Sequence, residues 1–274
     1  MTDLQAIILA VVQGITELFP ISSLAHAVLL PALLDWKVDE SADGFLPFLV
    51  VMHLGTALAL FAYFWRDWFT FATAVLFRRG PKAQGERRIF WRVVVATIPA
   101  VIVGFFLEKQ LRHAFGSPVL AAGFLIANGV MLFAAERLKG RQDRPLARLR
   151  WIDAIAIGLW QCLALIPGFS RSGATMAGGY LAGLNHEDAA RFSFLTATPI
   201  ILGAAVLEAP KLIKHHDSFG AVAIVAGVVA GVTAFISVAL LMRWFKQPEV
   251  KGFDPFAIYC ALAGAGSLAW LLLR

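Results

Sequence analysis

Long apolar runs recur along this chain, and they are continuous rather than alternating. Six of them are long enough to cross a hydrocarbon core of about 30 Å as helices. They cover residues 45–65, 89–107, 117–136, 191–208, 219–243 and 255–273. Continuous runs favour membrane helices over a β-barrel, whose strands alternate between apolar and polar residues. The pattern therefore predicts an all-α integral membrane protein with six transmembrane helices.

Two further apolar stretches are interrupted, and no half of either stretch is long enough to cross. Pro20 interrupts residues 4–34, and Pro167 followed by Gly168 interrupts residues 152–184. Proline removes a backbone donor and disfavours helix in the preceding residue, so each interruption is a turn. We therefore predict two re-entrant helical hairpins that enter the membrane and leave it on the same side.

The two halves of the chain show a weak internal repeat. Residues 19–23 around the first turn match residues 166–170 around the second. Each half, about 1–137 and about 151–274, holds one hairpin and three spans. Three crossings is an odd number, so the second half must be inverted relative to the first. The sequence thus predicts one membrane domain, 1–274, whose two broken helices face each other around a ligand.

Composition agrees with a membrane protein and argues against a nucleic-acid binder. Apolar residues make up 59% of the chain and charged residues 15%, and the mean hydropathy is +0.74. The net charge is +6, but all lysines and arginines except Arg171 are confined to loops and chain ends, where membrane orientation explains them. The first apolar stretch has no basic region before it, so no cleaved signal peptide is expected. Cys162 and Cys260 lie in different apolar segments and are expected to be buried.

The loops on the two sides of the membrane differ in charge. Most lysines and arginines lie within residues 66–92, 137–150 and 243–251, together with Arg191. The opposite loops hold only Lys37, Lys109, Arg112, Lys211, Lys214 and Arg274, and their first loop is acidic. The positive-inside rule places the basic loops in the cytoplasm. Both termini are then expected to be periplasmic or extracellular.

The first broken stretch carries a carboxylate, two hydroxyls and an imidazole. Gln13 and Glu17 are four residues apart on one helix, so their oxygens can jointly hold a divalent cation such as Mg²⁺ or Ca²⁺. Beyond the turn, Ser22 and Ser23 are four and three residues before His26, which allows a hydroxyl to lie beside an imidazole base. Either Ser23 or His26 can serve as a nucleophile, and we favour Ser23 with His26 as its base.

The second broken stretch supplies groups that bind anions. Ser170, Arg171, Ser172 and Thr175 open a helix, where free N–H groups, the positive dipole end and a guanidinium converge. Phosphate is the ligand that this set of groups suits. Arg171 is also the one lysine or arginine outside the loops and ends, and a charge in that place is costly unless it has a function.

Single polar residues in membrane helices usually have structural roles. A lone serine or threonine commonly bonds a backbone carbonyl, and an amide commonly joins helices. An intramembrane carboxylate is costly, which favours a function for Glu17. We assign His53, Asn128 and Glu136 to packing or interfacial positions because no motif surrounds them.

Over nearly its full length the chain resembles the bacterial undecaprenyl-diphosphate phosphatases that are linked to bacitracin resistance. The motifs that carry the resemblance are residues 13–23 with His26, and residues 167–175. The family's pattern implies that position 13 and Glu17 belong to a metal-assisted site and that Ser23 or His26 is the nucleophile. It implies that Arg171, with Ser170, Ser172 and Thr175, binds diphosphate. Position 13 is glutamine here, where many relatives have glutamate.

The resemblance also implies an activity and a location. Hydrolysis of undecaprenyl diphosphate would regenerate the monophosphate carrier for cell-wall polymers, at a site open to the periplasm. The expected partners are this lipid, the surrounding membrane lipids and a second copy of the chain in a homodimer. A polyprenyl-phosphate flippase is the alternative, because inverted repeats with broken helices are also typical of transporters. A lipid-binding scaffold without activity is a third, weaker alternative.

Overall fold

The structure is a computed structural model that describes residues 1–36, 45–138, 140, 144–214, 216–247 and 252–273. Within those ranges, the side chains of residues 45–47, 108–115, 207–214 and 216–220 are not described. Every regular element in this part is a helix, which confirms the all-α prediction. The first loop was expected to be acidic, but its acidic residues after Asp35, which are Asp39, Glu40 and Asp43, lie outside the described residues.

Eleven α-helices and two short 3₁₀ helices make up the described chain. In order they are α1 (Asp3–Thr16), α2 (Ser23–Leu33), α3 (Phe45–Tyr63), α4 (Trp65–Leu76), α5 (Pro81–Phe115), α6 (Pro118–Arg137), η1 (Leu146–Arg148), α7 (Trp151–Gln161), η2 (Cys162–Leu165), α8 (Arg171–Leu181), α9 (His186–Lys214), α10 (His216–Phe245) and α11 (Asp254–Leu273).

Both interrupted stretches form helix–turn–helix hairpins, as predicted. In the first, α2 begins after Ser22, whose hydroxyl accepts a hydrogen bond from the Ala25 N–H at 3.3 Å. In the second, α8 begins after Ser170, whose hydroxyl accepts from the Gly173 N–H at 3.0 Å. Serine caps of this kind satisfy N–H groups that have no partner inside the helix. The sequence therefore places the two caps at matching points of the hairpins.

The second turn depends on Gly168. Its φ of +108° lies in the left-handed region, which glycine enters without a steric penalty. A Cβ atom at this position would lie only 2.6 Å from the Ala121 carbonyl oxygen of α6. Glycine is thus required both by the backbone angle and by the approach of the turn to α6.

Five of the described helices are long and apolar enough to span a membrane. They are α5 to Leu107, α6, α9 to Val206, α10 from Ala221, and α11. The sixth predicted span, 45–65, corresponds to α3, which is followed after Phe64 by α4 at a bend of 69°. The bent pair counts as a sixth candidate span if it crosses as one unit. The helices of the two hairpins are shorter, at 10–17 residues.

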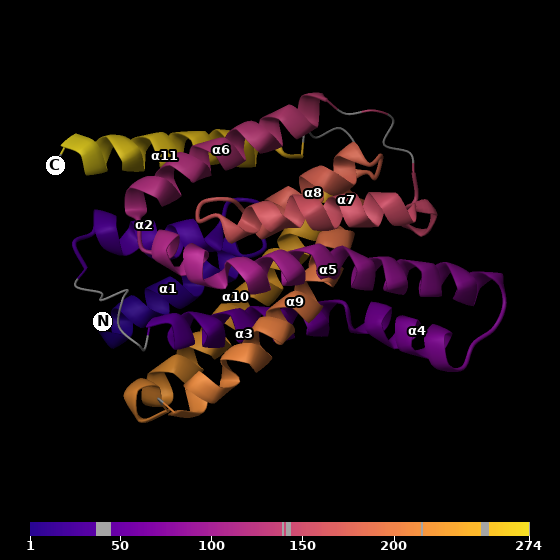
Figure 1. Cartoon of the computed structure of the whole chain (residues 1–274), viewed down its shortest axis with the longest axis horizontal. Coiled ribbons are helices and arrows are strands. Elements are labelled where there is room, and N and C mark those ends of the chain that lie inside the picture. The colour runs from indigo at the N-terminus through magenta and orange to yellow at the C-terminus, as the bar shows by residue number, and fades with distance from the viewer. Residues whose placement is uncertain (37–44, 139, 141–143, 215, 248–251, 274) are drawn as a thin grey trace.

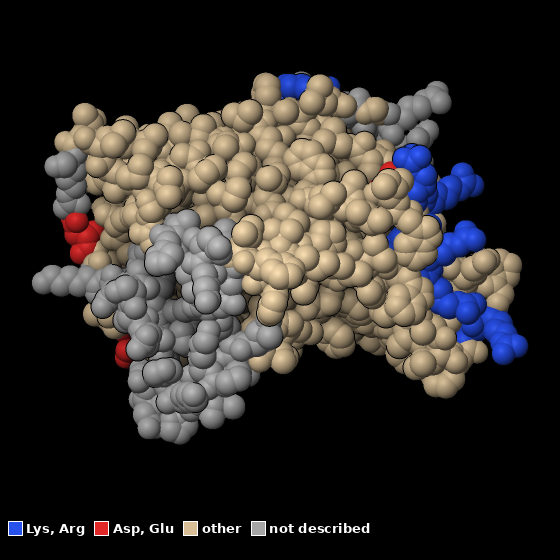
Figure 2. Space-filling view, in the orientation of Figure 1, with Lys and Arg blue, Asp and Glu red and all other residues tan. Residues whose placement is uncertain are grey.

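The helices pack so that α8 lies inside the bundle, with every residue from Ser172 to Tyr180 buried. α3 packs against α10 and α9, α1 against α10, and α5 against α7. α6 and α11 lie side by side along one edge of the molecule, and the chain's two ends lie at the same end of it (Figure 1). Most of the lysine and arginine side chains in view gather at the opposite end, near the α4–α5 junction (Figure 2). This agrees with the predicted separation of charge.

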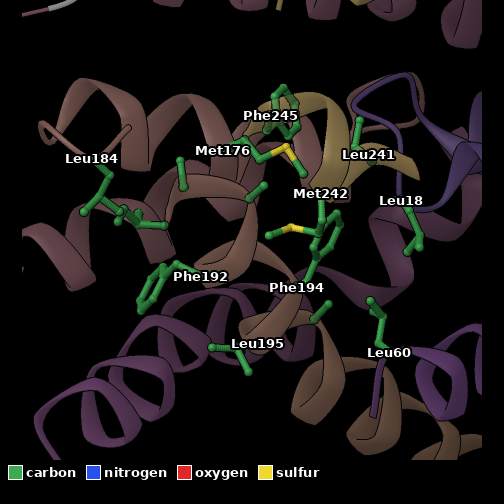
Figure 3. Close-up of a cluster of buried hydrophobic side chains, with 14 of the residues drawn as sticks. Leu18, Leu60, Met176, Leu184, Phe192, Phe194, Leu195, Leu241, Met242 and Phe245 are labelled. Atoms are coloured by element: carbon green, nitrogen blue, oxygen red, sulfur yellow. The ribbon is translucent and has the colours of Figure 1, made fainter. Parts of the chain in front are cut away.

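The main core cluster fills the space between the second hairpin and its neighbours. Its buried side chains include Met176 of α8, Phe194 of α9 and Met242 of α10, and Figure 3 shows how they converge. Leu18, directly after the predicted site residue Glu17, is fully buried in the same cluster. Because lipid tails are as apolar as these side chains, they stabilise a membrane protein through close van der Waals packing. The first turn is therefore anchored in the core at the residue next to Glu17.

Candidate active site

The turns of the two hairpins meet inside the bundle. Arg171, the first residue of α8, donates from Nη2 to Oε1 of Glu17 at 2.9 Å. The Ser172 hydroxyl donates to the carbonyl of Phe19 at 3.1 Å. The structure thus brings together the two motifs that the sequence placed 154 residues apart, at Glu17 and Arg171.

Asn128 of α6 makes hydrogen bonds to both turns. Its Nδ2 donates to the Pro20 carbonyl at 2.9 Å, and its Oδ1 accepts from the Ser170 N–H at 3.0 Å. The side chain is fully buried, so both bonds are made away from water, where an unpaired group is costly. Sequence analysis assigned Asn128 to packing, whereas the structure gives it the role of a bridge between the two turns.

The Glu17 carboxylate is the centre of the site. It is 7% exposed and accepts at Oε2 from the Ser23 hydroxyl at 2.6 Å and from Gln13 Nε2 at 3.2 Å. His53 of α3 places Nε2 3.4 Å from the same oxygen. Together with Arg171 at Oε1, four side chains from three different parts of the chain converge on one carboxylate. Ser23 is therefore held by an acceptor that can take its proton.

His26 does not pair with Ser23. Its Nδ1 lies 2.7 Å from the carbonyl oxygen of Ser22, and its Nε2 lies 2.7 Å from the hydroxyl of Tyr259 on α11. A carbonyl only accepts, so Nδ1 carries a hydrogen and the ring is turned toward the start of its own helix. In the described part of the chain no hydrogen bond joins Ser23 to His26. The predicted contact is replaced by Ser23 with Glu17.

Ser22 occupies an unusual backbone conformation at this point. Its φ is +68°, in the left-handed region that non-glycine residues rarely adopt. Such a conformation costs about 1–3 kcal/mol and persists where surrounding contacts hold it. The bond from His26 to the Ser22 carbonyl is one of these contacts. His26 therefore holds the turn that presents Ser23.

The hydroxyls of the second motif make hydrogen bonds to other groups of the protein. Ser170 and Ser172 share a hydrogen bond of 2.9 Å, and Thr175 donates to the Arg171 carbonyl at 2.7 Å. Thr175 also bonds Ser193 of α9, a residue that sequence analysis did not select. These hydroxyls shape the start of α8, and their predicted role as diphosphate ligands stays a prediction.

The Arg171 guanidinium has a nitrogen that no described residue accepts from. Its Nη1 is buried and has no partner within the described residues. It lies at the first turn of α8, where the backbone N–H groups of Arg171 and Ser172 have no acceptor inside the helix and the dipole favours an anion. An unpaired buried guanidinium nitrogen is costly unless a ligand takes it up. The arrangement suits a phosphate group placed between Arg171 and Ser23.

The donor set does not fit a resident divalent cation. Mg²⁺ and Ca²⁺ take several oxygen ligands, and the described residues include no group of three His, Cys, Asp or Glu side chains that could hold a metal. The one carboxylate, Glu17, already accepts from an amide, a hydroxyl and a guanidinium and faces an imidazole. Within the part of the chain that the structure describes, Gln13 offers one oxygen without a partner, Oε1. The predicted cation at Gln13 and Glu17 stays a prediction, and no step below uses it.

Sequence reasoning missed two side chains of this site. His53 was assigned to packing, and Tyr259 was not considered, because neither lies within a motif. Both sit on helices distant in sequence from the hairpins, so only the packing of α3 and α11 reveals them. The available signal was weak: His53 is a titratable residue inside an apolar run, which marks a functional candidate by default.

Fold and site together define a class of protein: a multi-helix membrane protein in which two interrupted helical stretches bring a carboxylate, hydroxyls and a guanidinium together in the interior. A family model described as "Bacitracin resistance protein BacA" matches residues 6–266. The chain belongs to this family, as its sequence motifs indicated.

Curated relatives are similar in sequence to this chain over almost its whole length. An undecaprenyl-diphosphatase of Gluconobacter oxydans is 54% identical and covers 100% of both chains. Proteins of the same name from Granulibacter bethesdensis and Acidiphilium cryptum are 51% and 50% identical. The first covers 99% of this chain and 97% of its own length, and the second covers 98% of both. This chain is therefore similar to them from end to end.

Proposed function

We propose that this protein is an undecaprenyl-diphosphate phosphatase that releases the terminal phosphate of its lipid substrate. The observation that carries the proposal is the Ser23 hydroxyl, held 2.6 Å from a Glu17 carboxylate that also pairs with Arg171, whose Nη1 has no partner within the described residues. A nucleophile, its base and a charge-stabilising cation are the parts that phosphoryl transfer requires. The names of the three relatives support this choice of substrate.

In the proposed reaction, Ser23 Oγ attacks the terminal phosphorus while its proton passes to Oε2 of Glu17. The bond between that phosphorus and the bridging oxygen breaks, and undecaprenyl monophosphate leaves with the bridging oxygen. Arg171 donates from Nη1 to the transferring phosphoryl group and offsets the charge that gathers on its oxygens. Water then attacks the phosphoserine, giving one proton to Glu17, and the Ser23 oxygen leaves with the proton that Glu17 took up in the first step. Glu17 then loses its remaining proton to the solvent as phosphate is released, which restores both the carboxylate and the free hydroxyl.

His26 has a positioning role in this scheme rather than that of the base. Both of its ring nitrogens are engaged, by the Ser22 carbonyl and the Tyr259 hydroxyl. It fixes the strained turn at Ser22, and through it the direction of the Ser23 side chain. The alternative in which His26 itself is the nucleophile remains testable by trapping the phosphorylated residue.

The proposed membrane arrangement has six spans and two re-entrant hairpins in an inverted repeat. The bent pair α3–α4 supplies the sixth span, and α1–α2 and α7–α8 are the hairpins. Contacts of matching helices support the repeat, since α1 packs on α10 and α7 packs on α5. The basic end then lies in the cytoplasm of a bacterial inner membrane, and the site opens to the periplasm. A homodimer and bound membrane lipids stay predictions.

A polyprenyl-phosphate flippase is the second candidate, favoured by the two opposed broken helices alone. A carrier needs donors for phosphate but has no use for a hydroxyl bonded to a carboxylate base. The test is phosphate release by purified protein in detergent from undecaprenyl diphosphate, with Ser23→Ala as the matched control. We expect release by the wild-type protein and its loss in the variant. Transport of lipid phosphate in vesicles without any release of phosphate would favour the flippase.

A further inference from the structure

A groove lies between the start of α5 and the start of α7. Its volume is about 580 Å³, and the residues that line it include Arg87, Arg88 and Trp91 of α5 and Trp151 of α7. α5 begins at the end of the molecule where most lysine and arginine side chains in view gather (Figure 2). The lining residues include none of the candidate active site. The groove is therefore a separate feature, with no part in the proposed reaction.

The arginines of the groove have no acidic partner among the described residues. Arg87 donates from Nε to the Ala83 carbonyl at 3.4 Å, and no described carboxylate pairs with Arg87 or Arg88. Glu86 is next to them in sequence but is not among the residues that line the groove. Two guanidinium groups without a compensating charge attract an anion, and their planar forks match the oxygens of a phosphate group.

A second basic hollow, formed by the chain just before α7, differs in this respect. It has a volume of about 380 Å³ and is lined by Arg144, Arg148 and Arg150, together with Pro145. Asp153 pairs with two of these arginines, at 2.6 Å from Arg144 Nη1 and 2.9 Å from Arg150 Nη2. This carboxylate offsets part of the charge of the hollow, whereas the groove beside α5 keeps both of its positive charges.

The groove lies where two helices pass from basic to apolar sequence. In α5, the basic pair at 87–88 comes directly before an apolar run, and the helix is long and apolar enough to span a membrane up to Leu107. α7 begins with Trp151, directly after a basic residue. Trp91 and Trp151 are 47% and 50% exposed, and tryptophans are enriched at the level of lipid headgroups. The groove is therefore placed at the boundary between headgroups and acyl chains.

Exposed apolar side chains continue from the groove along both helices. They recur seven and eleven positions after Trp91 on α5, and four and eight positions after Trp151 on α7, at Ile98, Ile102, Ile155 and Leu159. Residues at these spacings share one face of a helix, and α5 packs against α7. A ligand with acyl chains can lay them along these faces while its phosphate reaches the arginines. A soluble phosphate would leave the apolar faces unused.

We propose that this groove binds the headgroup of an anionic phospholipid of the cytoplasmic leaflet, with Arg87 and Arg88 on its phosphodiester and the two tryptophans beside its glycerol. Basic pockets between membrane helices on the cytoplasmic side are typical sites for anionic headgroups. A zwitterionic lipid fits less well, because its ammonium group would lie near two guanidinium groups. The site depends on the proposed membrane orientation and is independent of the proposed phosphatase function.

The experiment measures lipid binding to the purified chain in detergent by native mass spectrometry. The protein is mixed with equal amounts of phosphatidylglycerol and phosphatidylcholine that carry the same acyl chains, and we expect it to retain phosphatidylglycerol in preference. Arg87→Gln/Arg88→Gln should bind this lipid about tenfold to thirtyfold more weakly, since each arginine near an anionic lipid contributes about fivefold in affinity. Its thermal unfolding midpoint should stay near that of the wild-type protein, because neither arginine has an ion-pair partner among the described residues.

Arg148→Gln/Arg243→Gln is the matched control. It removes the same charge from two exposed arginines that do not line the groove, so its preference for phosphatidylglycerol should stay. A photoactivatable residue in place of Gln84, which is exposed and lines the groove, provides a readout of position. In vesicles of the two lipids it should crosslink to phosphatidylglycerol, and this crosslink should be lost when Arg87 and Arg88 are replaced. Glycerol 3-phosphate, which has no acyl chains, should not displace the lipid.

Three results would overturn the proposal. Equal affinity of the wild-type protein for the two lipids would show that no selective site exists. An equal loss of phosphatidylglycerol binding in both double variants would show a general attraction between charges at this end of the molecule. Displacement of the lipid by an equal concentration of glycerol 3-phosphate would assign the groove to a soluble phosphate. None of these results bears on phosphate release from undecaprenyl diphosphate, so the proposed function is tested separately.

Discussion

Replacing Arg171 removes the main positive charge of the proposed site. Its Nη2 holds Glu17 at 2.9 Å, and its buried Nη1 is free to bind phosphate. Arg171→Lys keeps the charge but loses the rigid planar fork, so its single nitrogen cannot keep the geometry of both contacts, to Glu17 and to the phosphate. Loss of one preorganised donor costs about 2.7–4 kcal/mol in the transition state. We therefore expect kcat of Arg171→Lys to fall by about a hundredfold to a thousandfold.

Arg171→Ala has a second expected effect, on stability. Removing one member of a buried ion pair leaves the other charge without compensation and costs about 3–5 kcal/mol. The side chains of Arg171 and Glu17 are 12% and 6% exposed, so water compensates little of this loss. Arg171→Ala should therefore lower both kcat and the midpoint of thermal unfolding, whereas Arg171→Lys should lower kcat alone.

The assay is phosphate release at saturating substrate from purified, monodisperse variants. Arg92→Lys is the matched control, because Arg92 is a buried arginine away from the hairpin turns. Its Nη1 donates to the Ala147 carbonyl at 3.2 Å, and its Nε has no partner within the described residues. This variant should keep wild-type kcat. An Arg171→Lys variant that keeps more than about a tenth of wild-type kcat would contradict the two-donor role, given the usual size of such effects.

Three further predictions concern packing, metal and orientation. Gly55→Ala would place a Cβ 2.0 Å from a backbone oxygen of α10, so we expect about 1–3 kcal/mol of destabilisation by thermal unfolding, while Gly85→Ala, with nothing within 4 Å, should be neutral. Gln13→Glu adds a second carboxylate, so calorimetry should detect Mg²⁺ or Ca²⁺ binding without substrate in this variant and little in the wild-type protein. In a background without native cysteines, an impermeant thiol reagent added outside cells should label Thr2→Cys and not Arg88→Cys, and the reverse pattern would invert the membrane orientation.

Local sequence was enough to predict the hairpins and their caps. Pro20, Pro167 and the two serine caps act within a few residues of themselves, so their effects do not depend on the rest of the fold. The meeting of Glu17 with Arg171 was also predictable in outline. A membrane interior makes single charges costly, so two opposite charges on opposed broken helices are expected to pair.

The detailed pairing inside the site depends on helix packing and could not be predicted. Spacing of three residues placed Ser23 and His26 on one helical face, but the carbonyl of Ser22 and the hydroxyl of Tyr259 take both nitrogens of the imidazole. His53 reaches Glu17 only because α3 lies beside the first hairpin. Contacts between residues this far apart in sequence leave no periodic pattern.

The span pattern was predicted well except around α3. Five predicted spans correspond to long helices, each extending one to eight residues beyond the predicted limits at one end or both. The apolar run 45–65 continued into a region rich in aromatic residues, and hydropathy alone did not reveal the bend of 69° between α3 and α4. The aromatic residues on both sides of the bend pack on one another, with Phe61 and Trp68 stacked at 6.2 Å. A hydropathy pattern cannot reveal such a contact between two helices.

The most direct test of the account is to trap the phosphorylated residue. Wild-type protein is mixed with undecaprenyl diphosphate labelled in its terminal phosphate and quenched within milliseconds, one half in acid, which preserves phosphoserine, and the other half in base, which preserves phosphohistidine. Both halves are then digested and analysed by mass spectrometry. Because Glu17 activates the Ser23 hydroxyl and both nitrogens of His26 are engaged, we predict an acid-stable, base-labile phosphoserine at Ser23, absent from Ser23→Ala. An acid-labile phosphohistidine at His26, or a Ser23→Ala variant that still releases phosphate at the wild-type rate, would contradict the account.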